Sequence, residues 1–302
     1  MLFIYNPIAG KGAIRDSLSY ILEEFSNHNI ELTVRPTHAA RDAIRTAREQ
    51  GRAYDMIVCS GGDGTLDEVV TGMMQGGFRT PVGYIPAGST NDYASSLGIP
   101  KEMTDAARAI AEGNVFSCDV GHVRNDEQES YFVYVAAFGA FTEVSYKTSQ
   151  DMKNAIGHLA YVLEGVKSFA NLKSWKLRFH SRERSGEGEF VYGMITNSNS
   201  VGGFKGITGN DVTLNDGLFE VTLIRMPPSF VDWPNIINAL LNGTKSEYVI
   251  TFKTGKLIVE PEGEIAWTVD GEYGGTYERI IVENIPQALP LILGESPESV
   301  LA

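Results

Sequence analysis

The stretch Val-Cys-Ser-Gly-Gly-Asp-Gly-Thr, residues 58–65, constrains the fold more than any other part of the sequence. An apolar run of buried-strand type, residues 55–58, leads into it, and residues 66–74 after it have apolar side chains at helical spacing. Glycines in such a turn let another molecule approach the backbone closely, and a helix N-terminus favours an anion. Two glycines alone indicate a plain turn. The full stretch, with Asp63 in it, favours Mg²⁺ that bridges phosphates.

The same stretch predicts how the following helix begins. Thr65 and Glu68 stand three residues apart, as in a capping box with Thr65 at the N-cap. Such a cap would place the helix start directly after the glycines.

Strand and helix patterns alternate through the first third of the chain. Apolar runs at residues 2–5, 30–34, 55–58 and 82–86 are separated by helical patterns, of which residues 14–25 are the clearest. A second helix is expected soon after Thr37, a possible cap. This order predicts an α/β domain with a parallel, Rossmann-like sheet built from βαβ units.

Two more glycine loops follow predicted strands. Residues 6–12 contain Gly10, Lys11 and Gly12 but do not make a P-loop, and residues 87–94 place Asp92 at a helix start. Each loop alone is compatible with an ordinary turn. Because ligands of parallel sheets bind at the carboxyl ends of the strands, the loops together predict a nucleotide with Mg²⁺.

Composition excludes several classes of partner. The net charge of −13 argues against nucleic acid, whose phosphates would be repelled. No apolar run approaches the length that spans a bilayer, and the first residues lack a basic signal-peptide region. The two distant cysteines, Cys59 and Cys118, indicate a reducing compartment, so a cytoplasmic location is expected.

The second half of the chain has a different pattern. Short alternating runs, many of them separated by turns with glycine or proline, indicate a mainly antiparallel β-sandwich or barrel-like sheet. They are residues 131–135, 175–179, 190–195, 219–224, 248–252, 256–259 and 266–269. We expect an α/β domain over residues 1–123 and a sandwich over 124–285. That residues 286–302 return to the first domain is an expectation that rests on the family resemblance described below.

One helical pattern, residues 156–170, interrupts the strands. The simpler interpretation is a helix packed on the sheet. However, residues 141–180 carry six Lys or Arg and three Asp or Glu, a local charge of +3 in an acidic chain. A basic surface beside an apolar helix would suit an enzyme that takes its substrate from an anionic bilayer.

Three segments together resemble the diacylglycerol kinase catalytic superfamily, and its bacterial, soluble lipid kinase branch in particular: residues 6–11, 60–65 and 88–92. The Gly-Gly-Asp-Gly element is shared with NAD kinases and phosphofructokinases, whereas the Gly-Ser-Thr-Asn-Asp element favours the lipid kinases. The resemblance implies a lipid kinase that uses ATP and Mg²⁺ to phosphorylate a primary hydroxyl, with diacylglycerol as the first expected acceptor. It also implies that the lipid substrate is met transiently at the membrane surface.

The resemblance also implies roles for individual residues. Those expected to bind the nucleotide are Asn6, Gly10, Lys11, Gly12, Thr37, Gly61, Gly62, Asp63, Gly64, Thr65 and Asn91. Mg²⁺ is expected at Asp63, Asp92 and Asp119, although helix capping for Asp92 and a strand-end position for Asp119 are the structural alternatives.

The acceptor end of the reaction is expected in the second half. Residues 269–272, Val-Asp-Gly-Glu, read by themselves as a hairpin turn, but the resemblance makes Asp270 the catalytic base and Glu272 a supporting acid. It further implies a structural divalent cation at Asp216 and Leu218.

Two other functions fit parts of the sequence. A NAD-kinase-like enzyme would share the Gly-Gly-Asp element but use a soluble acceptor. A nucleotide- or lipid-binding protein without catalysis would bind lipid and release no ADP. The identity of the acceptor lipid and a homodimer through an exposed sheet edge are left open by the sequence.

Overall fold

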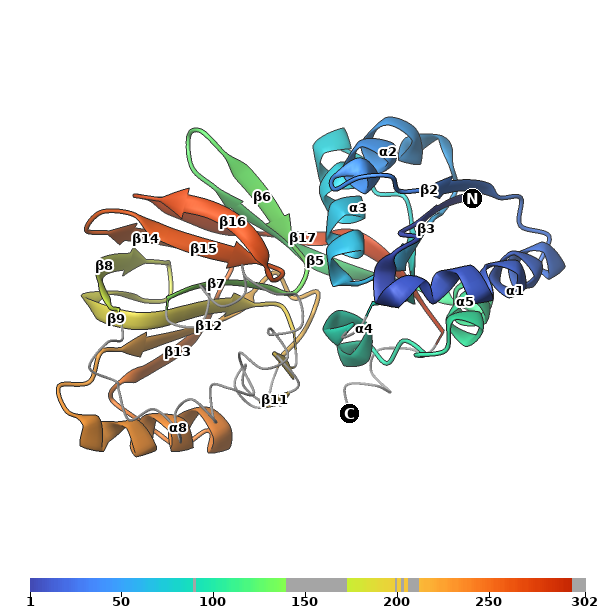
Figure 1. The fold of residues 1–302 in the computed structure, drawn as a ribbon. Coiled ribbons are helices and arrows are strands. Elements are labelled where there is room, and N and C mark those ends of the chain that lie inside the picture. The colour runs from blue at the N-terminus through green and yellow to red at the C-terminus, as the bar shows by residue number, and fades with distance from the viewer. Residues whose placement is uncertain (89–90, 140–172, 199, 202–203, 206–211, 295–302) are drawn as a thin grey trace. The chain divides into compact units, whose positions relative to one another are not determined.

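The computed structural model describes the whole chain except residues 89–90, 140–172, 199, 202–203, 206–211 and 295–302 (Figure 1). The chain divides into two compact units, which are residues 1–119 with 287–302 and residues 120–286. The expected helix over residues 156–170, and Lys147, Lys153 and Lys167 of the basic cluster, lie outside the described residues.

The first unit alternates strands and helices along the chain. Its elements are β1 (Leu2–Tyr5), a 3-10 turn (Ala9–Gly12), α1 (Ile14–Asn27), β2 (Thr33–Pro36), α2 (Asp42–Gln50), a 3-10 turn (Gly51–Ala53), β3 (Ile57–Gly61), α3 (Asp63–Gly76), β4 (Val82–Pro86), α4 (Asp92–Ser96) and α5 (Met103–Glu112). The strand expected at residues 30–34 begins three residues later, because residues 30–32 lie outside the ladder with β1.

The strands of this unit form a parallel sheet in the order β2-β1-β3-β4-β17, where β17 is Ile280–Leu293. The order reverses between β1 and β3, because β2 follows β1 in the chain but lies on its other side. Ligands of such sheets bind at this switch point, outside the carboxyl ends of the strands. The loops after β1 and β3 flank it.

Helices cover both faces of the parallel sheet, with α1 and α5 on one face and α2 and α3 on the other (Figure 1). Under α1 and α5 lies a core in which Phe3, Val58 and Ile85 from the strands meet Phe25 and Ile110 from the helices. On the other face, Gly72 of α3 lets α2 approach closely, since a Cβ there would lie 2.4 Å from the Ile44 carbonyl oxygen.

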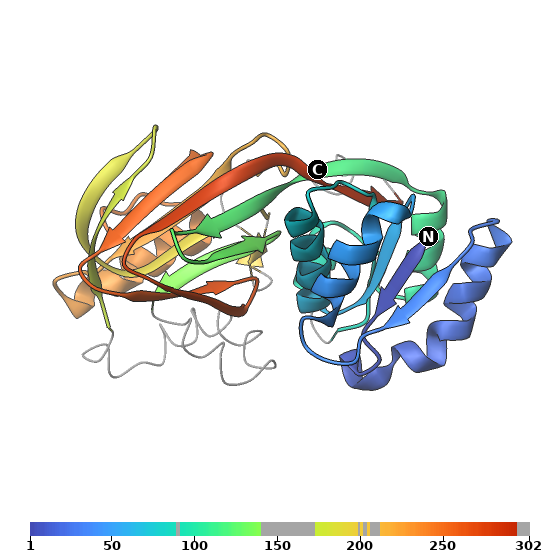
Figure 2. The ribbon, with the colours of Figure 1, turned by 90° about the horizontal axis from the view of Figure 1, so that it is seen from above.

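The second unit consists mainly of antiparallel strands. They are β5 (Asn114–Arg124), which enters from the first unit, β6 (Glu129–Phe132), β7 (Val135–Gly139), β8 (Trp175–His180), β9 (Ser185–Thr196), β10 (Ser200–Val201), β11 (Phe204–Lys205), β12 (Phe219–Arg225), β13 (Val249–Thr254), β14 (Lys256–Pro261), β15 (Ile265–Val269) and β16 (Glu272–Tyr277). A 3-10 turn (Phe230–Asp232) and α8 (Trp233–Asn242) lie between β12 and β13. Figure 2 shows β5 and β17 side by side, and the two strands pair.

The sandwich expected over residues 124–285 corresponds to this antiparallel part. Its core gathers aromatic side chains from several strands, among them Phe132, Phe138, Phe190, Phe219 and Trp267. The prediction of a single strand over residues 131–135 is wrong. The chain breaks at Val133 and Tyr134 into β6 and β7, because the backbone N–H groups there bind a side chain, as described below.

Candidate functional site

The loop after β1 has an unusual backbone. Gly10, Lys11 and Gly12 all have positive φ, at 54°, 62° and 82°. A side chain at Gly10 is impossible, because its Cβ would lie 2.1 Å from the carbonyl oxygen of Ala87. The loop therefore touches the segment after β4, and the glycines expected at this place are required by the backbone.

The loop after β3 touches the same segment. The Gly61 carbonyl accepts N–H bonds from Ala87 at 2.7 Å and Gly88 at 3.1 Å. A Cβ on Gly88 would lie 2.6 Å from the Cα of Gly62, so these backbones lie against each other. The three glycine loops expected to converge do so, at the carboxyl edge of the parallel sheet.

Asp63 is the first residue of α3, and Gly62 is the N-cap. The capping box expected at Thr65 and Glu68 is wrong. Thr65 lies inside the first turn, where its side chain is 7% exposed and packs against Gly61. Glu68 instead accepts the N–H groups of Arg41 at 2.8 Å and Ala43 at 3.2 Å, at the start of α2.

The side chain of Tyr84 in β4 lies close to the Asp63 carboxylate. Its hydroxyl lies 3.3 Å from Asp63 Oδ1, 3.3 Å from the Gly61 carbonyl oxygen and 3.3 Å from Asn91 Oδ1. Burial, and then the charge of Asp63, raise the pKa of Tyr84 well above its usual value. The phenol thus stays protonated and donates.

Asn91 organises the loop after β4. Its Oδ1 accepts the Gly88 N–H at 3.0 Å, and its Nδ2 donates to the Gly88 carbonyl at 2.8 Å. Asn91 is also the N-cap of α4, with φ 53°. Residues 89–90 and the side chain of Asp92 lie outside what the structure describes.

Three further residues expected to bind the nucleotide lie near the same edge: Asn6, Thr37 and Gly64, which is the second residue of α3. Asn6 donates its N–H to the Ser60 carbonyl, and its Oδ1 accepts the Ile8 N–H at 3.1 Å. Thr37 donates its N–H to the Tyr5 carbonyl. Thr37 does not cap α2, which begins at Asp42 with Arg41 as N-cap.

Asp119 is fully buried in β5. Its Oδ1 accepts the Gln287 N–H at 2.8 Å, and Gln287 itself has φ 51°. In this contact the carboxylate fixes β17 at an irregular residue of that strand.

Asp270 lies in the turn between β15 and β16, with φ 45° and a side chain that is 6% exposed. Its Oδ2 accepts the Val133 N–H at 2.8 Å, and its Oδ1 accepts the N–H groups of Tyr134 at 3.0 Å and Val135 at 2.8 Å. The turn between β6 and β7 thus forms an amide cradle around this carboxylate. Glu272 begins β16 and is exposed.

Asp216 forms a tight turn in which its Oδ1 accepts the Leu218 N–H at 3.0 Å. Its Oδ2 lies 3.8 Å from Lys253 Nζ, which is also 3.3 Å from Glu220 Oε1. Despite that proximity, neither buried oxygen of Glu220 accepts a hydrogen bond of good geometry from the residues that the structure describes. Burial raises the pKa of Glu220 to about 7, and Lys253 opposes the rise.

Metal ligands do not cluster among the described side chains, where no three His, Cys, Asp or Glu residues could hold an ion together. Mg²⁺ keeps several waters, so separate carboxylates at one edge still fit a nucleotide-bound ion. The Asp216 turn fits a dedicated ion less well. Its single carboxylate faces an ammonium group, and Leu218 offers only its backbone carbonyl.

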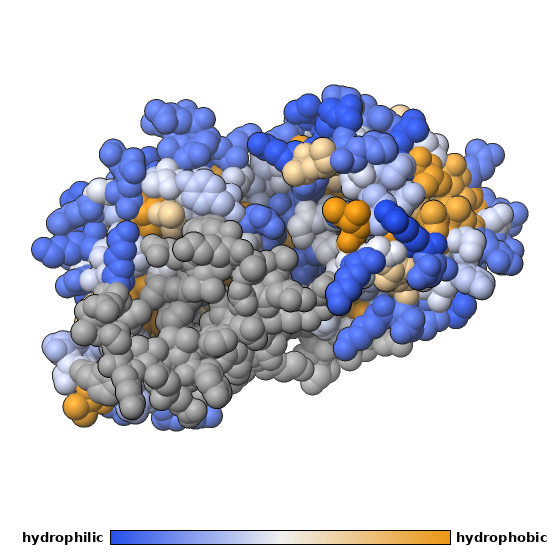
Figure 3. Space-filling view, viewed as in Figure 1, coloured by the Kyte–Doolittle hydropathy of each residue, from blue (hydrophilic) through white to orange (hydrophobic). Residues whose placement is uncertain are grey.

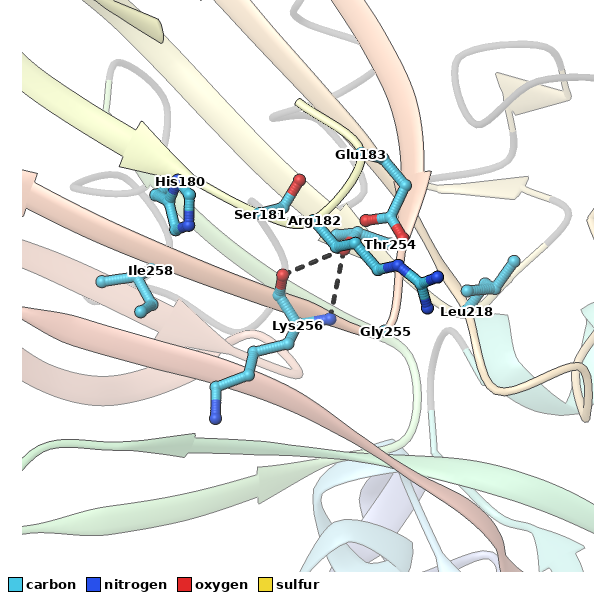
Figure 4. Close-up of a pocket in the computed structure, with 9 residues that line it drawn as sticks. All are labelled: His180, Ser181, Arg182, Glu183, Leu218, Thr254, Gly255, Lys256 and Ile258. Carbon is cyan, nitrogen blue, oxygen red and sulfur yellow. Dashed lines mark hydrogen bonds between the residues drawn. The ribbon is translucent and has the colours of Figure 1, made fainter. Parts of the chain in front are cut away.

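A cavity of about 520 Å³ opens on the second unit (Figure 4). Arg182, Lys256 and His180 line it, together with Glu183 and Thr254, whose hydroxyl bonds the Lys256 backbone. Lys256 Nζ is engaged by Glu283 at 3.1 Å. None of the expected site residues lines this cavity except Leu218.

The described part of the face drawn in Figure 3 is mainly polar. Hydrophilic residues predominate in Figure 3, with smaller hydrophobic areas between them. Large hydrophobic side chains that are more than half exposed in the described part come from separate elements: Ile8, Tyr20, Val115, Val231 and Tyr273. Within that part, no helix is long and apolar enough to cross a bilayer.

Three features of the site were missed from the sequence. Tyr84 reads as an ordinary buried strand residue, and only its place one strand from the Gly-Gly-Asp turn hints at a role. The amides of residues 133–135 carry no side-chain signal at all. Glu220 breaks the apolar run of its strand, and that break is a usable signal.

Comparisons with known proteins agree with these observations. A family model described as the diacylglycerol kinase catalytic domain matches residues 1–123. A protein of Bacillus subtilis (strain 168) named diacylglycerol kinase is 32% identical over 276 residues, covering 90% of this chain and 89% of the relative. One of the same name from Staphylococcus carnosus (strain TM300) is 30% identical over 275 residues, covering 90% and 88%.

Solved structures share the fold. A structure from Bacillus anthracis str. Sterne matches with a TM-score of 0.82 at 23% identity, covering 97% of this chain and 96% of the other. A second from that organism, described as a diacylglycerol kinase, matches with a TM-score of 0.74 at 21% identity and the same coverage. These likenesses support the α/β part with its parallel strands and the antiparallel part that follows.

Proposed function

The chain belongs to the diacylglycerol kinase family, and we propose that it is an ATP-dependent lipid kinase that transfers the γ-phosphate to the primary hydroxyl of diacylglycerol. The observation that carries this proposal is the meeting of three glycine loops at the switch point of the parallel sheet. A helix N-terminus, with glycine loops gathered beside it and a nearby carboxylate, suits a metal-bound polyphosphate.

The nucleotide residues follow from this arrangement. Gly10, Gly12, Gly61 and Gly62 allow the loops to take the backbone shape and the mutual contacts of this site, and Lys11 supplies a countercharge for phosphate. Others that we assign to the nucleotide are Asn6, Thr37, Gly64, Thr65 and Asn91. Asp63, Asp92 and Asp119 would hold Mg²⁺, directly or through water, and the ion would neutralise charge on the transferred phosphoryl group.

We assign the acceptor end to Asp270 as general base, with Glu272 in support. The amide cradle fixes the direction of the Asp270 carboxylate, and a base must be oriented before its basicity matters. The same three bonds also support a purely structural role, in which Asp270 shapes the turn between β6 and β7. Kinetics and stability of one variant separate these roles.

The resemblance implies a further cation at Asp216 and Leu218. Lys253 already places positive charge beside Asp216. We therefore assign no step of phosphoryl transfer to a cation at this turn.

We also propose that the protein works in the cytoplasm and meets its substrate by transient contact with a membrane surface. The excess of basic residues between positions 141 and 180 of an otherwise acidic chain supports this. A homodimer is compatible with the edge strands of the sheet but no described contact requires it.

Phosphate transfer from labelled ATP to vesicles that contain diacylglycerol tests the proposal. Asp270→Asn should lower kcat by at least about a hundredfold and leave Mg-ATP binding unchanged, because the base acts only on the acceptor. Asp126→Asn, in an exposed turn of the same unit, is the control. Retained turnover would refute the base, whereas lost folding, seen as a lower melting temperature, would indicate the structural role.

The acceptor is tested in the same assay. Transfer to NAD with none to lipid would favour the NAD-kinase-like alternative. Lipid binding without release of ADP would favour a binding protein that has lost catalysis.

A further inference from the structure

We propose that Tyr84 is a positioning residue, whose hydroxyl orients the Asp63 carboxylate toward the cation of Mg-ATP. The inference rests on the proposed function, because it takes Asp63 as the residue that meets the cation. It adds a residue to the site that no glycine loop or acidic motif reveals.

The hydroxyl of Tyr84 sits where two loops meet. Within 3.3 Å it has the Asp63 carboxylate and the Gly61 carbonyl after β3, and the Asn91 side chain after β4. Its ring is fully buried in the strand between these loops. The oxygen therefore has a fixed position relative to the backbone that the nucleotide would approach.

A phenol has one proton, so it makes one strong donor bond at a time. Of the three acceptors, the carboxylate is the strongest because it is charged. The Gly61 carbonyl and Asn91 Oδ1 lie at the same distance but are neutral and therefore weaker acceptors. The donor bond to Asp63 thus sets the direction of that carboxylate relative to β4.

Asn91 connects the Tyr84 hydroxyl to the loop after β4. Its amide bonds both backbone groups of Gly88, and Gly88 lies against Gly62. The hydroxyl thus contacts the Asp63 side chain and the Gly61 backbone directly, and it reaches the Gly88 backbone through the Asn91 side chain. Removing it should disturb the direction of Asp63 while leaving the sheet intact.

Tyr84→Phe removes this hydroxyl alone. Isothermal titration calorimetry without lipid tests the proposal, since it gives the affinity for Mg-ATP and, in the presence of EDTA, the affinity for metal-free ATP. The variant should weaken Mg-ATP binding about tenfold, as expected for a lost hydrogen bond to a charged group, and should change metal-free ATP binding by less than about threefold. The matched control is Tyr277→Phe, since Tyr277 is also buried and donates to a backbone carbonyl, that of Gly274, in the second unit.

A double-variant cycle tests whether Tyr84 acts through Asp63. In an Asp63→Asn background, Tyr84→Phe should weaken Mg-ATP binding by no more than about twofold, because coupled residues are not additive. Wild-type affinity in Tyr84→Phe, an equal loss with and without Mg²⁺, or a full tenfold loss in the Asp63→Asn background would each overturn the assignment. A wild-type protein that does not bind Mg-ATP would instead overturn the proposed function itself.

Discussion

Two carboxylates of the second unit, Asp270 and Glu220, are equally buried but differ in the hydrogen bonds that they accept. Asp270 accepts three backbone N–H bonds, whereas among the described residues neither oxygen of Glu220 accepts a hydrogen bond of good geometry. The Lys253 ammonium, 3.3 Å away, partly compensates its charge. Burial disfavours the charged form of a carboxylate, so it raises the pKa of Glu220 to about 7, although Lys253 opposes the rise. Glu220 is therefore expected to make stability depend on pH.

Glu220→Gln should remove part of this pH dependence. The pKa of Glu220 is higher in the folded protein than in the unfolded chain, so the folded state holds the extra proton between those values. Its contribution is fully present at low pH and is lost as pH rises through about 7. Between pH 5 and 8, the wild-type free energy of unfolding should fall by about 2–3 kcal/mol more than that of the variant.

Urea denaturation at several pH values measures this difference. Glu187→Gln, at an exposed position of β9, should keep the wild-type slope. Parallel pH profiles for the wild type and Glu220→Gln would contradict the effect of burial.

At the scale of elements, Glu68 shows that an acidic side chain in the first turns of one helix can bond the start of another helix. Glu68 stands where a capping box would use it for α3, but it accepts two N–H groups at the start of α2. Those amides have no partner within their own helix, and an anion there also meets the favourable end of the helix dipole. Glu68 thus links the two helices on one face of the sheet.

Glu68→Ala should destabilise the protein by about 0.5–2 kcal/mol, as the loss of an N-terminal cap does. Chemical denaturation measures the change. The control is Glu49→Ala on α2, where an exposed pair with Arg48 contributes little. An equal loss in both variants would show that Glu68 acts only as a surface charge.

The elements also show what sequence patterns predict well. The strands at residues 2–5 and 82–86 and the helix at residue 14 are observed as predicted, because their apolar spacing is local and strong. The break at Val133 and Tyr134 was not predicted, because its cause, Asp270, is far away in the chain. Local propensity has no information about such a partner.

At the scale of the whole molecule, β17 belongs to both units. Its first part pairs with β14, from Lys256↔Glu283 to Val259↔Ile280, and its last part pairs with β4 at Leu291↔Val82. Asp119 holds the strand between these parts at Gln287. The end of the chain thus completes a sheet that the beginning of the chain started.

Leu291→Ala and Leu257→Ala test whether the units lose stability separately. Both side chains are buried, Leu291 in the first unit and Leu257 in the second, and each truncation should cost about 2–5 kcal/mol. Hydrogen exchange should show lost protection mainly in residues 1–119 for the first variant and in residues 120–286 for the second. Equal losses throughout the chain in both variants would mean that the molecule unfolds as one unit.

The sequence by itself determined the strand–turn–helix order, the glycines at the turns and the change from parallel to antiparallel strands. These follow from local spacing and from backbone angles that only certain residues adopt. The tertiary structure alone decided which groups meet: Tyr84 with Asp63, Glu68 with α2, the amide cradle with Asp270, and Lys253 with Asp216 and Glu220. Hydrogen bonds and ion pairs act over a few ångströms in space, and the chain distance between their partners leaves no local pattern.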